Sequence, residues 1–422
     1  MRRPRPLATF AAALLGIALT LAACGGGGGG GPITVSGQVL DNLGAPMSGA
    51  KVVLNGVTTS LVTTGADGKF TFSSVTPPYA LAVRGGTRLI EIHGLTRADP
   101  VVATGGAGAV RSVKLSGLFT GPTFPLPSGQ AILLGATNGV LASTSSGASG
   151  GYGPTGFGWL GPSTITTDLS ALQVTASSGL IASYGLFGKR SNVQLQDGVD
   201  ETGLDIALTT PMTTKSTTLT YTAGAYTTTG AMSYLTLKGG GATFLLLGGT
   251  LPIASGASVL LPDGGGTFLA RGQDASGNSA GLIRSAVLGG TTSFALPASV
   301  LLKSSLPAAG ATGVSKTPIL SWTPVSGATL YDVQLSGGGQ SYVFFLPGDT
   351  STFSFPDLSA LGIPLTGGTS YDWSVTAVMG GGFRPDTIAD PAGGGGLNEY
   401  ALVLAQDLTF YVSASNSFTT AP

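Results

Sequence analysis

Beyond its first residues, this chain carries its apolar residues in short runs of Val, Leu, Ile and Thr, which Gly, Pro, Asn, Asp or Ser interrupt every few positions. That pattern is typical of many short strands joined by turns. No long stretch there repeats apolar residues at i, i+3, i+4 and i+7, so extended helices are not expected. Because 42% of the residues are hydrophobic and only 9% are charged, a buried core is possible, and we predict an all-β protein.

The length of the chain and its single cysteine limit how such a protein is built. At 422 residues the chain is too long for one ordinary domain and suggests three or four. One Cys in the whole sequence excludes an intrachain disulfide and a cysteine-based metal cluster, so the fold must be held by core packing, and no cofactor is expected. The 19 basic residues are too sparse for a basic stripe, which disfavours nucleic acid as a partner.

The N-terminus has the three zones of a secretory signal. Three arginines within residues 2–5 form the positive end, and residues 7–21 form an apolar segment that is shorter than the roughly 20 residues of a spanning helix. Leu21-Ala22-Ala23-Cys24 then resembles the lipobox of bacterial lipoproteins. The resemblance implies a signal peptide over residues 1–23 and a lipid on Cys24 that anchors the chain to a membrane. The alternatives are an uncleaved signal anchor and cleavage without lipidation, which leaves a free thiol.

Residues 24–32 would link the lipid to the folded part. Residues 25–31 are all glycine and are expected to behave as a flexible tether with a reach on the order of 15 Å. In lipoproteins of two-membrane bacteria, Asp directly after the Cys tends to retain the protein at the inner membrane, and here that position is Gly25. The resemblance therefore implies a location in the cell envelope, and it favours the outer membrane if the organism has two membranes.

Residues 33–116 carry the pattern of a small β-sandwich. Apolar and polar residues alternate from residue 33 onward, a turn follows at residues 41–46, and Asp67-Gly68 between alternating segments is a strong hairpin signal. The stretch VSGQVLDNLGAPMSGAKVVLNG resembles the carboxypeptidase regulatory-like (transthyretin-like) domain. That resemblance implies a β-sandwich fold and no peptidase activity, because in this family catalysis belongs to a different domain.

The last part of the chain, residues 303–422, has features of an Ig-like sandwich. Trp322 lies on an early predicted strand, and residues 365–371 end in Tyr371 at the start of another strand, as in a tyrosine corner. These residues resemble those of a fibronectin type III module. One departure is the connection at residues 380–405, which is far longer than usual and is either a mobile loop or the carrier of one or two extra strands at residues 400–404.

The middle of the chain allows two interpretations. Short apolar runs lie between turns such as Asn138-Gly139 and Asp263-Gly264, which predicts further strands. We divide this part into β-sandwiches over residues 117–209 and 210–302, with a single larger β domain as the alternative. With the outer modules, the first interpretation gives tandem Ig-like and transthyretin-like β-sandwich modules after a cleaved lipoprotein signal peptide.

Residue types that carry catalysis are scarce. His93 is the only His, so a zinc-peptidase set is impossible and general base chemistry has little to build on. Two stretches fit G-x-S-x-G, at residues 147–151 and 277–281. With 70 Gly chance matches are expected, and the motif also needs a helix after it and a His later in the chain. We therefore predict that the protein is not an enzyme.

One candidate binding site consists of the aromatic residues Tyr152, Phe157 and Trp159, which lie in a Gly/Pro-rich stretch. If these rings are exposed on a loop, they can stack against sugars. The alternative is that they fill the core beneath that loop, as aromatic residues among glycines usually do.

A second candidate is the acidic cluster Asp197, Asp200 and Glu201 on a Gly-containing loop. Three carboxylates on such a loop can hold calcium, which prefers oxygen ligands. The alternative is a hairpin tip that the acidic residues merely keep solvated.

Two functions fit these features. The first is a non-catalytic, lipid-anchored stalk of β-sandwiches that binds a glycan or a protein partner in the cell envelope or serves adhesion. The second is an accessory subunit that captures a substrate, such as a carbohydrate, for a surface enzyme or an uptake system. Both predict the same sequence features, and the ligand itself is not predicted.

Overall fold

The computed structural model describes residues 31–41, 44–56, 60–104, 111–136, 140–141, 143–144, 149–159, 163–177, 180–226, 228–239, 242–245, 253–380, 382–391 and 407–422. Within these ranges the chain is almost entirely β-strand, which confirms the predicted fold class. Its one α-helix there is the short α1 (Pro385–Ile388). None of the helices in this part of the chain is long and apolar enough to span a membrane.

The first sandwich begins at the tether and has two facing sheets. One has the order β4-β1-β7, and the other follows the pairings β3–β2, β2–β5 and β5–β6. Alternate residues of β1 and β4 point between the two sheets, which buries Val35, Val39, Phe70 and Phe72. The strands are β1 (Ile33–Leu40), β2 (Lys51–Leu54), β3 (Val62–Thr63), β4 (Lys69–Val75), β5 (Tyr79–Gly85), β6 (Arg88–Leu95) and β7 (Val101–Ala103).

The second sandwich contains a sheet of order β10-β12-β8-β15 and a sheet in which β9 and β14 flank β13. Its strands are β8 (Arg111–Thr120), β9 (Gln130–Ala136), β10 (Val140–Leu141), β11 (Ser143–Thr144), β12 (Gly151–Trp159), β13 (Thr164–Ser177), β14 (Leu180–Gln196), β15 (Ile206–Ala207) and β16 (Thr210–Pro211). The predicted boundary at residue 116 falls inside β8 and is wrong, because β8 pairs with β12 and β15.

The third sandwich places a sheet of order β20-β17-β23 against the sheet that contains β18, β21 and β22. Phe268 and Ala270 on β21 and Leu219 on β17 belong to one core cluster. The strands are β17 (Thr214–Thr222), β18 (Thr228–Gly239), β19 (Ala242–Leu245), β20 (Ser258–Pro262), β21 (Gly266–Gln273), β22 (Ser279–Ser285) and β23 (Thr291–Ala295).

The fourth sandwich has the features expected of a fibronectin type III-like module. Trp322 is 3% exposed and packs against Tyr331 with 5.2 Å between ring centroids. The Tyr371 hydroxyl accepts a hydrogen bond of 2.8 Å from the Thr366 backbone N–H, as in a tyrosine corner. The strands are β24 (Ser304–Leu306), β25 (Ala311–Val314), β26 (Ile319–Trp322), β27 (Leu330–Gly337), β28 (Gln340–Pro347), β29 (Thr352–Ser354), β30 (Ser370–Met379), β31 (Leu408–Val412) and β32 (Asn416–Thr420), with a 3-10 turn, η3 (Ser359–Leu361).

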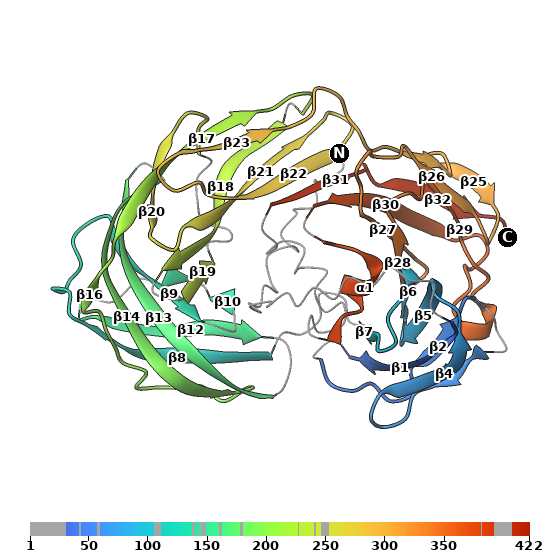
Figure 1. The fold of residues 1–422 in the computed structure, drawn as a ribbon, viewed down its shortest axis with the longest axis horizontal. Coiled ribbons are helices and arrows are strands. Elements are labelled where there is room, and N and C mark those ends of the chain that lie inside the picture. The colour runs from blue at the N-terminus through green and yellow to red at the C-terminus, as the bar shows by residue number, and fades with distance from the viewer. Residues whose placement is uncertain are drawn as a thin grey trace.

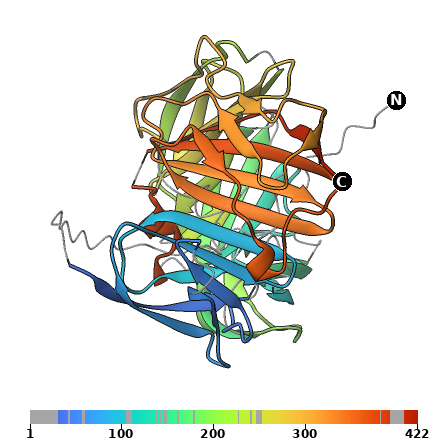
Figure 2. The same ribbon diagram turned by 90° about the vertical axis from the view of Figure 1, so that its right-hand side faces the viewer.

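One sheet of each sandwich continues into the next, so that the four share a single long sheet. Strand β9 pairs with β19, β22 pairs with β31, and β28 pairs with β6. Figure 1 shows the resulting arc, in which the blue N-terminal strands lie beside the orange and red C-terminal ones. The expected stalk is therefore wrong, because the chain folds back and its first and last sandwiches are neighbours (Figure 2).

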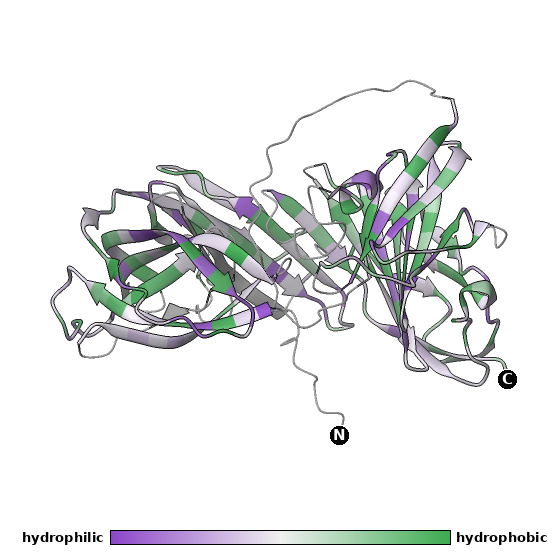
Figure 3. Cartoon of the chain, turned by 90° about the horizontal axis from the view of Figure 1, so that it is seen from below, coloured by the Kyte–Doolittle hydropathy of each residue, from purple (hydrophilic) through white to green (hydrophobic). Residues whose placement is uncertain are grey.

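The junction between the first and fourth sandwiches is buried on both faces, with apolar side chains around one buried carboxylate, Glu91. Residues 88–92 of β6 run parallel to residues 341–345 of β28. On β28, Tyr342 and Phe344 point into the core of the fourth sandwich, whereas Val343 and Phe345 point into that of the first. Many strands show alternating hydrophobic and hydrophilic bands (Figure 3), but β28 is buried without interruption over five residues. A strand covered on both faces requires such a run.

We predict that Phe345→Ala lowers the free energy of unfolding by about 3–5 kcal/mol, because it removes a buried aromatic side chain and leaves a cavity. Leu306→Ala is the control, since Leu306 is 54% exposed, and it should change the stability by less than about 0.5 kcal/mol. Denaturant unfolding of the purified protein measures both. Equal effects of the two substitutions would show that β28 is not part of a shared core.

Candidate functional site

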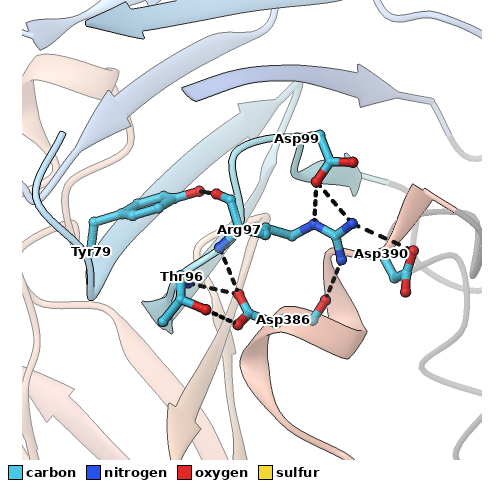
Figure 4. Close-up of polar contacts among 6 residues, drawn as sticks. All are labelled: Tyr79, Thr96, Arg97, Asp99, Asp386 and Asp390. Atoms are coloured by element: carbon cyan, nitrogen blue, oxygen red, sulfur yellow. Dashed lines mark hydrogen bonds and ion pairs between the residues drawn. The ribbon is translucent and has the colours of Figure 1, made fainter. Parts of the chain in front are cut away.

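A cluster of polar side chains lies where α1 meets the loop that joins β6 to β7 (Figure 4). The local sequence explains the helix: Pro385 occupies its first turn, Arg384 before it is extended, and Asp386 follows. Proline at this position is favoured because its missing N–H has no partner in a helix start. The Thr387 hydroxyl accepts a hydrogen bond from the Arg384 N–H at 2.8 Å, which closes the turn.

Asp386 connects the helix to the first sandwich. Its Oδ1 accepts hydrogen bonds from the backbone N–H groups of Thr96 at 2.7 Å and Arg97 at 3.2 Å. The Thr96 hydroxyl donates to Oδ2 of the same carboxylate. One ionised side chain thus satisfies three donors of a loop almost 290 residues earlier in the sequence, and hydrogen bonds to a charged acceptor are the stronger kind.

Arg97 connects the two sandwiches as well, with a side chain of the first sandwich that reaches α1. Its Nη1 donates to the Asp386 backbone carbonyl at 2.8 Å, and its Nη2 lies 2.9 Å from Asp99 and 3.5 Å from Asp390. The Tyr79 hydroxyl donates to the Arg97 carbonyl at 2.6 Å. Burial, followed by the negative charge of Asp386, raises the pKa of Tyr79, so this hydroxyl stays protonated and remains a donor.

We call the β6–β28 pairing and this polar cluster together the seam. In the polar cluster, the carboxylates of Asp99 and Asp390 pair with the Arg97 guanidinium. The carboxylate of Asp386 accepts two backbone N–H groups of the loop. Over the described ranges there is no group of three or more His, Cys, Asp or Glu that could hold a metal ion. The arrangement fixes the two sandwiches to each other.

The single His also belongs to the seam. His93 Nε2 lies 2.8 Å from Oε1 of Glu91, a carboxylate whose side chain is 6% exposed. The imidazole meets the Phe353 ring edge-on at 5.5 Å. This contact agrees with the expected role of His93 as an ordinary strand residue.

Neither G-x-S-x-G stretch has the structure that a nucleophile needs. Ser279 is the first residue of β22, and Ser149 lies two residues before β12 begins. A strand follows each serine, whereas a nucleophile elbow joins a strand to a helix. These serines therefore do not sit at a strand-to-helix elbow.

The aromatic cluster does not form an exposed sugar platform, which corrects the first candidate. Tyr152, Phe157 and Trp159 lie on β12 and are 4%, 1% and 0% exposed. The Tyr152 hydroxyl donates to the Leu204 carbonyl at 2.6 Å, and burial raises the pKa of Tyr152 to about 12. The rings fill the core of the second sandwich, which is the alternative named for them from the sequence. Strand β12 tolerates Pro154 because the register shifts between Tyr152 and Thr155.

The acidic cluster does not gather as the second candidate site requires: among the described residues, Asp197, Asp200 and Glu201 do not form a group that could hold a metal ion. Asp197 accepts the Ser112 N–H at 2.9 Å and pairs with Arg111, and Asp200 accepts the Lys114 N–H at 3.2 Å. The backbone of Glu201 bonds to β8 as well, through its N–H to the Lys114 carbonyl at 2.9 Å.

The segment 197–208 acts as an irregular edge strand for β8. After Asp197 and Asp200, the Glu201 carbonyl accepts the Ser116 N–H at 2.9 Å, and Asp205 accepts the Leu118 N–H at 2.9 Å. Of the four alternate N–H groups of β8, those of Ser112, Lys114 and Leu118 donate to side-chain carboxylates, where a regular strand would offer backbone carbonyls. We call this segment the acidic edge. Covering an edge in this way removes a template for pairing with another chain.

Several predictions fall on residues outside the described ranges. They are the signal peptide over residues 1–23, Cys24 with the glycines up to residue 30, the Asn138-Gly139 turn, and the extra strands at residues 400–404. Within the long connection after β30, residues 382–391 contain α1 instead of a strand, and β31 extends the last strand along β30. The sequence Arg384-Pro385-Asp386 is a helix-start signal that could have indicated α1, whereas its contact with Arg97 could not be read from the sequence.

Among the comparisons with known proteins, a family model matches the first sandwich. Residues 34–97 match the family model of the carboxypeptidase regulatory-like domain, which confirms that resemblance for the first sandwich. A search of the curated proteins gives no match. Among solved structures, the FN1–FN3 domains of chicken CNTN1 are 7% identical over 81% of this chain and 94% of that one, with a TM-score of 0.17. A tetra-tandem repeat of a large adhesion protein is 15% identical over 82% and 95%, with a TM-score of 0.15. At these TM-scores neither likeness carries an inference about function.

We predict that Asp386→Ala lowers the free energy of unfolding by about 1.5–3 kcal/mol, because it removes a charged acceptor from three donors. Asp349→Ala removes the same charge from an exposed position and should change the stability by less than about 0.5 kcal/mol. Denaturant titration of both variants at pH 7 measures the difference. If both variants unfold alike, the polar cluster does not hold the sandwiches together.

We also predict that replacing Asp197, Asp200 and Asp205 together by Ala makes the protein self-associate as its concentration rises, because the N–H groups of β8 become free to pair with another copy. The matched control replaces the same three residues by Asn, which keeps an acceptor oxygen at each position and should sediment like the parent. Sedimentation velocity over a concentration series tests this. An Ala variant that sediments like the parent at every concentration would contradict the role of the acidic edge.

Proposed function

We propose that the chain is a non-catalytic, lipid-anchored protein of the cell envelope that presents its β-sandwiches to a glycan or protein partner. The observation that carries the proposal is that side chains which could take part in catalysis or metal binding are engaged in contacts within the fold. In the part of the chain described by the structure, the side chains of His93, Asp197 and Asp200 make structural contacts. An architecture without a catalytic set suits presentation and adhesion, and the carboxypeptidase regulatory-like match over residues 34–97 implies a fold and no chemistry.

The lipobox-like sequence supports the location. Leu21-Ala22-Ala23-Cys24 directly follows the apolar segment, and Gly25 favours the outer membrane in a two-membrane cell. Several acyl chains on one Cys would hold the protein stably, since each buried CH₂ contributes about 0.8 kcal/mol. Strand β1 begins at Ile33, immediately after the glycine tether. The first sandwich is therefore proposed to be the membrane-proximal one.

The anchor is tested with Cys24→Ala. Radiolabelled fatty acid should be incorporated into the wild-type chain and not into this variant, because the variant lacks the thiol that takes the lipid. Cys24→Ser is a second variant that keeps a hydroxyl and lacks the thiol, and it should behave in the same way. Labelling of either variant would refute the proposed site of lipidation.

A further inference from the structure

The seam closes a long loop of the chain. It joins residues 88–92 to residues 341–345, Arg97 to Asp386, and the Val101 N–H to the Ala389 carbonyl at 2.9 Å. All strands of the second and third sandwiches, from β8 to β23, lie between these contacts along the sequence. The outer sandwiches are therefore joined to each other directly, and the inner two lie inside the closed loop.

We propose that the seam is a mechanical bypass, through which tension between the membrane tether and a partner held by the fourth sandwich passes without loading the second and third sandwiches. The inference rests on the proposed function, because it takes the N-terminal tether as one point of load. A force on a cross-linked chain follows the shortest set of bonds between its two ends. Here that path runs from β1 through the first sandwich, across the seam and into the fourth.

The two ends of this path are built to hold. Strand β1 is hydrogen-bonded on both sides, to β4 and to β7, and β32 is bonded on both sides, to β30 and to β25. Neither terminal strand can leave its sheet by breaking the contacts of one edge alone.

The seam itself combines three kinds of contact. Its backbone hydrogen bonds lie between strands whose side chains are mostly buried on both faces, so that water has little access to them. The polar cluster is a second attachment, on the loop that follows β6. Arg84 adds a third, because its Nη1 donates to the carbonyl of Leu361. Opening the seam requires all of these contacts to break.

Single-molecule force spectroscopy tests the bypass. The unlipidated chain is held at Cys24, its only thiol, and at a C-terminal handle. Before the seam opens, only residues outside its outermost contacts, 24–87 and 391–422, can be released, which is roughly 95 residues or ~320 Å of extended chain. Unfolding of the second sandwich and unfolding of the third would each appear as a separate increase in the length of the chain. We expect neither increase before the event that opens the seam. After that event the inner residues, roughly 185 of them and ~600 Å, are released.

Two comparisons decide the outcome. Asp386→Ala should lower the force of the seam event and leave the later events of the inner sandwiches unchanged, whereas Asp349→Ala should change neither. Release of an inner sandwich before any seam event in the wild-type chain would overturn the bypass. The test uses unlipidated protein, so a failure of the proposed anchor, which fatty-acid labelling detects, does not affect its result.

Discussion

The architecture depends on one pair of parallel strands, β6 and β28, that belongs to two hydrophobic cores. Parallel strands need cover on both faces, and here the first sandwich covers one face while the fourth covers the other. Val343 and Phe345 pack on one side, and Tyr342 and Phe344 pack on the opposite side. Neither sandwich can bury this pair alone, so the N-terminal and C-terminal parts of the chain stabilise each other.

The same device recurs in the second sandwich. On β9, Ile132 and Leu134 belong to the core of that sandwich, whereas Leu133 between them belongs to the cluster shared by the third and fourth. The long sheet is thus buried on alternate faces at its junctions. Four sandwiches that a sequence suggests as separate modules become one continuous structure without a disulfide.

The sequence predicts what local patterns determine. The strand-rich fold, the buried Trp322 and the tyrosine corner at Tyr371 depend on alternation and on neighbours within a few residues, and the structure has all three. The boundary at residue 116 is wrong because β8 crosses it and finds its partners more than 30 residues further along the chain. The pairing of β6 with β28 could not be predicted, although the uninterrupted apolar run of β28 is a sign that both faces are covered. The candidate sites failed for the same reason, since Trp159 and Asp197 are polar or aromatic residues whose partners lie elsewhere in the sequence.

The acidic edge has a consequence for a crowded surface. Only 9% of the residues are charged, so copies of the chain repel one another only weakly, and net charge is what commonly keeps proteins apart. Anchoring to a membrane would raise the local concentration of the protein and align its copies. The carboxylates along β8 accept hydrogen bonds from the backbone N–H groups through which neighbouring copies could otherwise join into an extended sheet. Although the protein has few charged residues, three of them lie where they prevent such pairing.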